Sequence, residues 1–259
     1  MTSPQATLPS SGADRDIGVS PSVVILQHTA CEGPGLIADI LREKGFAARI
    51  VRVDRSEPVP TSLDESAAVI AMGGPMGVRE VHRYRHLRQE LDLIDHALAN
   101  GVPVLGVCLG SQLLAACLGS RVHTAEELEV GWHAVHLLRA AAADALWQDC
   151  APTFPAFHWH HDVFDLPPGA VALATSAMTE CQAFRFGTHA YGVLFHLEVS
   201  QGQIAAMVEQ FGAELSGAGI DPEALLDELP SRVAAAHRIG RTVFARWADL
   251  VLAASGCAA

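Results

Sequence analysis

The sequence predicts an α/β fold with three layers, in which a mostly parallel sheet with a mixed edge is flanked by helices. In the first half of the chain, short apolar runs alternate with amphipathic helical patterns, which is typical of parallel strands joined by helices. In the middle, strand-like runs follow one another with only turns between them, as at an antiparallel sheet edge. Half of the 259 residues are hydrophobic, so the chain can bury a large core.

The first half of the chain supplies the predicted parallel strands. We expect strands at residues 23–28, 47–53, 67–72 and 102–107, and helices at 35–44, 84–99 and 113–118. Gly45, Asn100-Gly101 and Gly119 follow the three helical patterns and mark their ends. Because parallel sheets bind ligands at the carboxyl ends of their strands, the loops after these strands are the first place to look for a site.

The second half of the chain predicts the antiparallel edge and then a helical end. We expect strands at residues 132–138, 156–164, 171–176, 181–185 and 191–195, and helices at 201–211, 222–228 and 231–254. Ser, Pro, Gly and Asp dominate the first residues, which indicates a disordered tail over 1–21. The predicted organisation is therefore this tail, one main domain over 22–215 and a helical extension over 216–259.

Composition excludes several classes of partner. The formal net charge is −12, and Lys and Arg are scattered, which disfavours nucleic acid or an anionic membrane. No apolar run approaches the ~20 residues needed to span a bilayer, and the first residues do not have the pattern of a secretory signal. The six cysteines form no Cys-x-x-Cys pair, which indicates free thiols in a reducing compartment. We therefore expect a cytoplasmic protein.

The strand expected at 102–107 breaks off at Gly106-Val107-Cys108-Leu109-Gly110 and continues as a helix. A strand that becomes a helix on Gly-x-Cys-x-Gly is the cysteine version of a nucleophile elbow, in which the central residue is strained and accessible. The partial positive charge of the helix N-terminus favours the thiolate that attacks. Cys108 is therefore a candidate nucleophile, although a small buried cysteine between two turn glycines would give the same pattern.

His196 and Glu198 lie two residues apart after the last apolar strand. At strand periodicity they point to the same side. A thiol nucleophile needs an imidazole to take its proton, and the imidazole needs an acceptor to fix its tautomer. His196 is thus the candidate base and Glu198 its partner. A surface strand end remains the alternative.

Two adjacent glycines, Gly73 and Gly74, follow the strand expected at 67–72. Without Cβ atoms, their N–H groups can approach an oxyanion closely, and the N–H of Leu109 is the natural second donor. An ordinary Gly-Pro turn is the other interpretation. A phosphate loop is disfavoured, because the chain has neither Gly-Lys-Ser/Thr after the glycines nor Gly-x-Gly-x-x-Gly.

Three motifs, in this order and spacing, resemble the class I glutamine amidotransferases, in particular stand-alone proteins similar to the amidotransferase domain of GMP synthase. They are Gly73-Gly74-Pro75-Met76-Gly77, Gly106-Val107-Cys108-Leu109-Gly110-Ser111-Gln112 and Phe195-His196-Leu197-Glu198. The likeness runs over about 23–211, where Val130-Gly131-Trp132 also matches as the opening of a strand.

The resemblance implies a flavodoxin-like fold and a catalytic triad of Cys108, His196 and Glu198. It also implies an oxyanion hole at Gly74 and Leu109, and substrate contacts from Gly73, Gln112 and His160. His160-His161-Asp162 stands where the family has His-x-Asp. Glutamine or another γ-glutamyl compound would be the substrate, with no cofactor, and a separate synthetase would accept the ammonia. The long last helix allows a homodimer.

The chain departs from the family's Gln-Phe-His-Pro-Glu at Leu194 and Leu197. Leu194 in place of Gln would remove a polar group near the site, which makes the substrate less certain. The alternatives to an amidotransferase are therefore a γ-glutamyl peptidase with the same triad and a catalytically idle binding or regulatory subunit. About 45 residues follow the amidotransferase-like region, too few for a synthetase domain.

We expect no metal site. Of the closely spaced histidines, only His158 and His160 could share a strand face, and no Cys or carboxylate lies at a typical ligand spacing from them. The remaining cysteines have no activating context, and we expect them to be inert: Cys31, Cys117, Cys150, Cys181 and Cys257.

Overall fold

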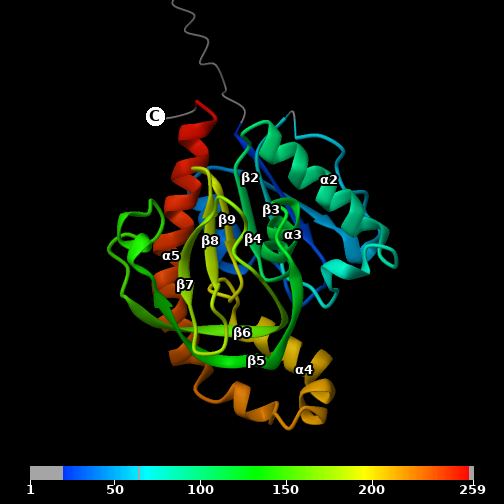
Figure 1. Cartoon of the computed structure of the whole chain (residues 1–259), viewed down its shortest axis with the longest axis vertical. Coiled ribbons are helices and arrows are strands. Elements are labelled where there is room, and N and C mark those ends of the chain that lie inside the picture. Colours follow the sequence, from blue (N-terminus) through cyan, green and yellow to red (C-terminus); the bar gives the residue numbers. More distant parts are fainter. Residues whose placement is uncertain (1–19, 64, 257–259) are drawn as a thin grey trace, which may run out of the picture.

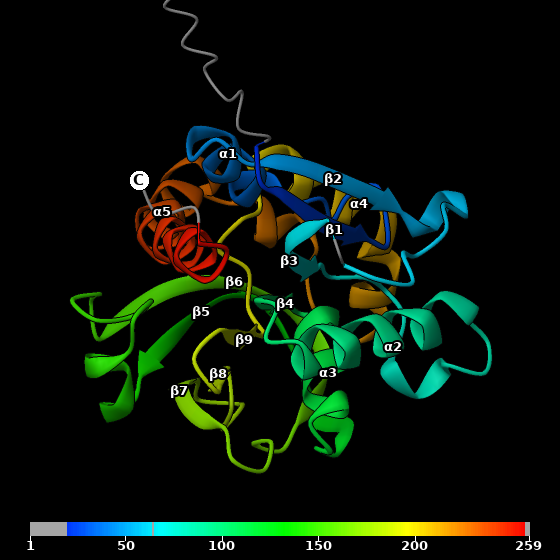
Figure 2. The same cartoon turned by 90° about the horizontal axis from the view of Figure 1, so that it is seen from above.

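The computed structural model describes residues 20–63 and 65–256, and it has the three-layer α/β fold that the sequence predicts. Among these residues, nine strands form one sheet in the order β2-β1-β3-β4-β9-β8-β7-β5-β6. Helices cover both faces of this sheet (Figures 1 and 2). The predicted tail at 1–21 lies almost entirely outside the described residues.

The parallel half of the sheet is formed by β2, β1, β3, β4 and β9. Its strands are β1 (Ser22–Gln27), β2 (Ala47–Arg52), β3 (Ser66–Ala71), β4 (Val104–Val107) and β9 (Ala190–Val193). The helices between the first four of them and after β4 are α1 (Gly35–Glu43), α2 (Arg85–Ala99) and α3 (Leu109–Cys117), with short 3-10 turns η1 (Val53–Arg55) and η2 (Val78–Glu80). The strands and helices among them lie within about four residues of their predicted bounds, and the two 3-10 turns were not predicted.

The other half of the sheet is antiparallel, as predicted. It comprises β5 (Val122–Leu137), β6 (Thr153–Phe164), β7 (Val171–Thr175) and β8 (Ala183–Phe186), with the 3-10 turn η3 (Arg139–Ala143) after β5. The predicted start of β5 at residue 132 is wrong by ten residues, because its first part is polar and its register with β6 shifts between Thr124 and Glu129. Trp132 therefore lies well inside this strand instead of opening it.

Two helices and a 3-10 turn complete the chain. They are α4 (Gln201–Gly217), η4 (Glu223–Leu226) and α5 (Leu229–Ala254). The short helix expected at 222–228 is only the 3-10 turn η4. Among the described residues, no helix is long and apolar enough to cross a membrane.

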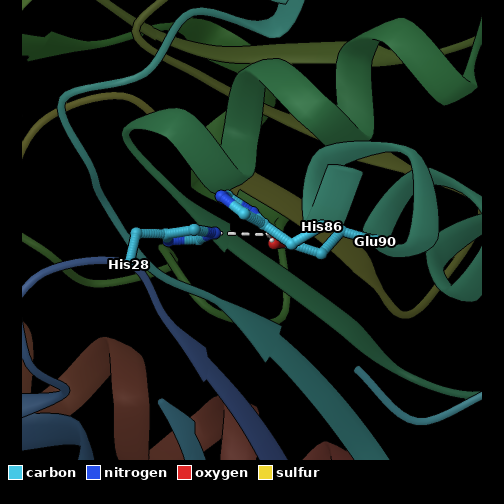
Figure 3. A group of neighbouring side chains, drawn as sticks. All are labelled: His28, His86 and Glu90. Carbon is cyan, nitrogen blue, oxygen red and sulfur yellow. Dashed lines mark hydrogen bonds and ion pairs between the residues drawn. The ribbon is translucent and has the colours of Figure 1, made fainter. Parts of the chain in front are cut away.

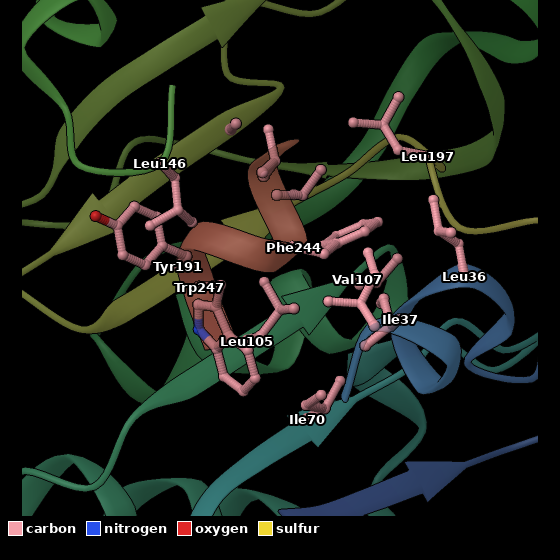
Figure 4. Packing of buried hydrophobic residues seen from close by; sticks show 14 of the residues in the cluster. Leu36, Ile37, Ile70, Leu105, Val107, Leu146, Tyr191, Leu197, Phe244 and Trp247 are labelled. Carbon is pink, nitrogen blue, oxygen red and sulfur yellow. The ribbon is translucent and has the colours of Figure 1, made fainter. Parts of the chain in front are cut away.

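Alternate residues of the central strands face two different hydrophobic clusters. In β1, Val23 and Ile25 pack with α1 and α5, whereas Val24 and Leu26 pack with α2 and α3. The first cluster includes Phe244 and Trp247 of α5, both buried against β4 and β9 residues (Figure 4). A division between a main domain and an extension at residue 215 stays a prediction, and α5 belongs to the same core as the parallel strands.

The topology places four loops at one edge of the sheet. Because β1, β3, β4 and β9 run parallel, their carboxyl ends lie together. The residues that follow these ends are His28, Gly73, Cys108 and, three residues after β9, His196. The parallel half of the sheet therefore brings the candidate residues to one place.

Candidate active site

Cys108 occupies the tight turn between β4 and α3. Its backbone has φ of 50° and ψ of −110°, a left-handed conformation that residues with a side chain rarely adopt. The neighbouring glycines are required by close packing: a Cβ on Gly110 would collide with the carbonyl oxygen of Ala71, and one on Gly106 would collide with that of Gly110. The N–H of Cys108 donates to the carbonyl of Val193 at 2.8 Å, which ties the turn to β9. The strained geometry expected of a nucleophile elbow is therefore present.

His196 and Glu198 form a buried pair beside this turn. Nδ1 of His196 lies 2.7 Å from Oε1 of Glu198, and Oε2 of the same carboxylate accepts a hydrogen bond from the N–H of Leu197 at 3.0 Å. The sequence argument placed both residues at the end of a strand, but β9 ends at Val193. Reciprocal backbone hydrogen bonds with Phe157, at 2.8 and 3.3 Å, hold the backbone of His196 instead.

The pKa of the Cys108 thiol differs from the lowered value that a position at a helix N-terminus led us to expect. Burial raises the pKa of Cys108, and the neighbouring His196 opposes this effect only in part. Burial works against the imidazolium form of His196, but Glu198 and Cys108 outweigh it and hold the pKa of His196 well above its usual value. Nε2 of His196 is buried and has no hydrogen-bond partner among the described residues. The position of Cys108 at the helix N-terminus therefore does not lower the pKa of its thiol as the sequence led us to expect.

Two backbone N–H groups near Cys108 are available to a ligand. Within the described part of the chain, the N–H groups of Gly74 and Leu109 donate to no backbone carbonyl outside their own helix or strand. Leu109 is the first residue of α3, so its N–H has no acceptor within that helix. A Cβ on Gly74 would lie 3.1 Å from a methyl carbon of Leu109, which places the two residues side by side.

A buried hydrogen-bond chain holds the loop that contains Gly73 and Gly74. Nδ1 of His28 lies 3.0 Å from the carbonyl oxygen of Gly73, and Nε2 lies 2.7 Å from Glu90 (Figure 3). His86 contacts the other oxygen of Glu90 at 2.9 Å. Burial opposes the charge on His28, but Glu90 outweighs it and raises the pKa of His28.

This chain of contacts has a consequence for the neighbouring peptide. In a trans peptide the C=O and the following N–H point in opposite directions. When His28 binds the carbonyl of Gly73, the N–H of Gly74 is therefore directed away from His28. Sequence reasoning missed His28 and Glu90, although His28 directly follows β1 and so lies at the edge of the sheet where a site was expected.

A cavity of about 490 Å³ opens beside Cys108. Gln112 and His160 line it, whereas Gly73 is not among its lining residues and packs against Glu32 instead. Nε2 of Gln112 donates to the carbonyl of Asp162 at 2.9 Å, which fixes this side chain at the wall. The candidate catalytic, oxyanion and pocket residues are thus brought together, and their roles stay predictions.

The two departures from the family motif do not reach this cavity. Leu194 is fully buried in the cluster around α2 and α3, and Leu197 is buried in the cluster around α1 and α5. Neither residue is among those that line the cavity. Leu194 therefore does not line the cavity, and its effect on the choice of substrate stays a prediction.

The expectation that no carboxylate accompanies the paired histidines is wrong. A carboxylate does accompany the paired histidines: Glu129 lies 3.5 Å from Nδ1 of His158 and 3.4 Å from Nε2 of His160. The carboxylate accepts hydrogen bonds from Thr179 at 2.7 Å and Gln182 at 2.9 Å. Burial lowers the pKa of His158 to about 2 and that of His160 to about 3, so both rings are neutral.

A second group of ligand-type side chains consists of His28, His86 and Glu90, which form the hydrogen-bond chain described above. We interpret both groups as hydrogen-bond networks, and the absence of a metal stays a prediction. Burial also raises the pKa of the other described cysteines, which agrees with inert thiols: Cys31, Cys117, Cys150 and Cys181. Cys257 lies outside the described residues.

The fold and the candidate site define an α/β protein with a cysteine on a tight turn between a strand and a helix. The sequence matches the family "Glutamine amidotransferase class-I" over residues 35–215, and the chain belongs to this family. It is 29% identical over 194 residues to the glutamine amidotransferase-like protein YfeJ of Salmonella typhimurium, covering 74% of this chain and 81% of that protein. It is 37% identical over 213 residues to a GMP synthase of Nitrosomonas eutropha, covering 77% of this chain but 38% of the synthase.

Solved structures agree with this assignment. A glutamine amidotransferase from Thermotoga maritima superposes with a TM-score of 0.81 at 31% identity, covering 89% of this chain and 99% of that one. One from Methylobacillus flagellatus gives a TM-score of 0.80 at 30% identity, with 89% and 95% covered. The resemblance inferred from three short motifs is therefore confirmed for the family and the fold.

Proposed function

We propose that this chain hydrolyses a γ-glutamyl amide, with glutamine as the first candidate substrate. One observation carries the proposal: the Cys108 thiol stands on a tight turn and interacts electrostatically with the imidazole of His196, whose Nδ1 lies 2.7 Å from the carboxylate of Glu198. This is the arrangement that a cysteine nucleophile, its base and the partner of that base require. Membership of the glutamine amidotransferase family supports the same chemistry.

In the proposed reaction, Cys108 transfers its proton to His196 and its sulfur adds to the γ-carbonyl carbon. The N–H groups of Gly74 and Leu109 stabilise the negative oxygen. As the carbon–nitrogen bond breaks, His196 returns the proton to the nitrogen, ammonia leaves and a γ-glutamyl thioester remains. His196 then takes a proton from water, whose oxygen displaces the sulfur, so glutamate leaves and the thiol forms again.

The charges around the pair fit these steps. The thiol is neutral at rest, because burial raises the pKa of Cys108. Burial opposes the imidazolium form of His196, but Glu198 and the Cys108 thiolate favour it, so the raised pKa of His196 describes the ion pair that exists after the proton has moved. The proton transfer therefore creates a charge that the protein is already arranged to stabilise.

The destination of the ammonia is a further part of the proposal. A synthetase would accept it, as the GMP synthase relatives, named as glutamine-hydrolysing, suggest. We place the protein in the cytoplasm, since the five described cysteines form no disulfide with one another. A homodimer stays a prediction from the sequence.

The test is release of ammonia and glutamate from glutamine, compared with γ-glutamyl peptides, by the purified protein and by Cys108→Ala. We expect turnover of glutamine that disappears in the variant. Turnover of the peptides alone would make the protein a γ-glutamyl peptidase. No turnover of either, together with an alkylation rate of Cys108 no faster than that of an ordinary cysteine, would favour a catalytically idle subunit.

A further inference from the structure

Glu32 is a buried carboxyl group that the proposed reaction does not use. It lies in the loop between β1 and α1, is only 6% exposed and lines the same cavity as Cys108. Among the described residues, its carboxylate has no hydrogen-bond or ion-pair partner, unlike the carboxylates of Glu90, Glu129 and Glu198. Since its oxygens are open to the cavity instead of sealed in the core, a ligand in the cavity can contact them directly.

Glu32 stands on the imidazole side of the cavity. A Cβ on Gly73 would collide with Oε2 of Glu32 and would lie 3.3 Å from Cε1 of His196. The carboxylate of Glu32 therefore lies next to Cε1 of the His196 ring, the carbon bonded to Nε2. Burial raises the pKa of Glu32, and the positive charges that His196 and His28 can carry counteract this effect.

The cavity has a second carboxylate, and its charge is compensated. Asp162 accepts a hydrogen bond from Thr124 at 2.9 Å and lies 3.3 Å from the guanidinium of Arg79. Of the two carboxylates that line the cavity, Glu32 is thus the one without a direct hydrogen-bond or ion-pair partner among the described residues. Its influence on the reaction depends on which part of the substrate lies beside it.

In the proposed reaction His196 delivers the proton to the departing nitrogen, so the leaving group would lie on the side of the cavity that holds Glu32. A positive charge on the leaving amine would pair with the carboxylate, and a negative one would be repelled within a partly water-excluded space. Ammonia from glutamine carries no substituent and avoids the repulsion. An amino acid released from a γ-glutamyl peptide carries an α-carboxylate, which the carboxylate of Glu32 would repel.

We propose that Glu32 is a specificity-determining carboxylate of the leaving-group subsite, which selects γ-glutamyl amides that release ammonia or a cationic amine and rejects those that release an amino acid. The proposal rests on the proposed function and narrows its substrate class. The bond that breaks is the same in every case: water replaces the amine on the γ-carbon, and the amine leaves with one proton.

The test uses three donors that share the γ-glutamyl group: glutamine, γ-glutamylglycine and the γ-glutamyl amide of ethylenediamine. For the wild-type protein we expect kcat/KM for the cationic donor to exceed that for γ-glutamylglycine by about tenfold or more. Glu32→Gln, which keeps the shape and removes the charge, should reduce this ratio by about tenfold. Glu32→Asp, which keeps the charge, should preserve the order of the donors. Glu209→Gln, at an exposed position on α4, is the matched control and should leave the ratio unchanged.

Each outcome bears on a different statement. Comparable turnover of the anionic and cationic donors by the wild type would overturn the role of Glu32 without any variant. So would an unchanged ratio in a folded Glu32→Gln protein. If the wild type cleaves none of the three donors, the proposed function itself fails, and the role of Glu32 fails with it.

Discussion

Replacing Cys108 by glycine should give a more stable protein than replacing it by alanine. At an ordinary position glycine is less favourable than alanine by about 0.5–1 kcal/mol, because the unfolded chain gains freedom. At Cys108 the order should reverse. With φ at 50° and ψ at −110°, the backbone at this position has a conformation that glycine adopts readily. A residue with a Cβ adopts the same conformation only at a cost in free energy.

The magnitude follows from the difference between two effects. Conformations of this kind cost a residue with a Cβ about 1–3 kcal/mol, and glycine avoids most of that cost. The entropic disadvantage of glycine, about 0.4–1 kcal/mol, opposes the gain. Both variants lack the sulfur, so the loss of its packing is common to them. We therefore expect Cys108→Gly to exceed Cys108→Ala by about 1 kcal/mol in free energy of unfolding, or about 2–4 °C in Tm for a chain of this size.

Urea unfolding followed by tryptophan fluorescence measures the difference, with thermal unfolding as a second method. Ala205→Gly, at an exposed position of α4, is the matched control and should lose about 1 kcal/mol. If Cys108→Gly is less stable than Cys108→Ala by the amount seen at an ordinary site, the strain assigned to the turn does not exist.

Three more predictions concern the residues around the turn. The double variant His28→Phe/Glu90→Gln should have a kcat for glutamine about 10–100-fold lower than the wild type, with a much smaller change in KM, because the Gly74 N–H loses its orientation. Steady-state kinetics measure both constants, and an unchanged kcat would refute the positioning role of His28. The folded-state pKa of His158 is lowered to about 2, so the unfolded chain takes up a proton below about pH 6.5 and stability falls there. Between pH 7.5 and 5.5, His158→Gln should therefore lose about 1.4 kcal/mol less stability in urea unfolding than the wild type, and equal losses would contradict the neutral ring. Gly110→Ala should destabilise the protein by about 3 kcal/mol, because its Cβ would collide with a carbonyl oxygen, whereas the uncrowded Gly202→Ala should be neutral or slightly stabilising.

Most of the fold follows from local patterns. The central strands are apolar on both faces and the helices have one apolar side, so their periods and their ending glycines are visible in the sequence. The beginning of β5 is not visible, because its first residues are polar and gain their strand structure from pairing with β6. The helix expected near residue 222 was inferred from a Pro at a helix start, but only a 3-10 turn forms there.

The site was predictable where its residues share a motif with their neighbours. Cys108, Gly74 and His196 fall into three short stretches whose chemistry is characteristic. His28 and Glu90 are 62 positions apart and meet only because β1 and α2 flank the same loop, so no local pattern indicates their contact. Glu32 was missed for a similar reason, since a single carboxyl group in a loop has no pattern at all.

The long final helix, α5, determines where this domain can be cut for the construction of chimeric proteins. The region that matches the family ends at residue 215, yet α5 packs against the segment that follows His196: His237 donates to the carbonyl of Val199 at 3.0 Å, and Gly240 leaves no room for a Cβ beside Leu197. A fragment cut at residue 215 would expose the apolar surface that Phe244 and Trp247 cover and would remove the contacts of α5 with Leu197 and Val199 on either side of Glu198. A chimera built by exchanging this domain should therefore include α5, because the region that matches the family ends before this helix begins.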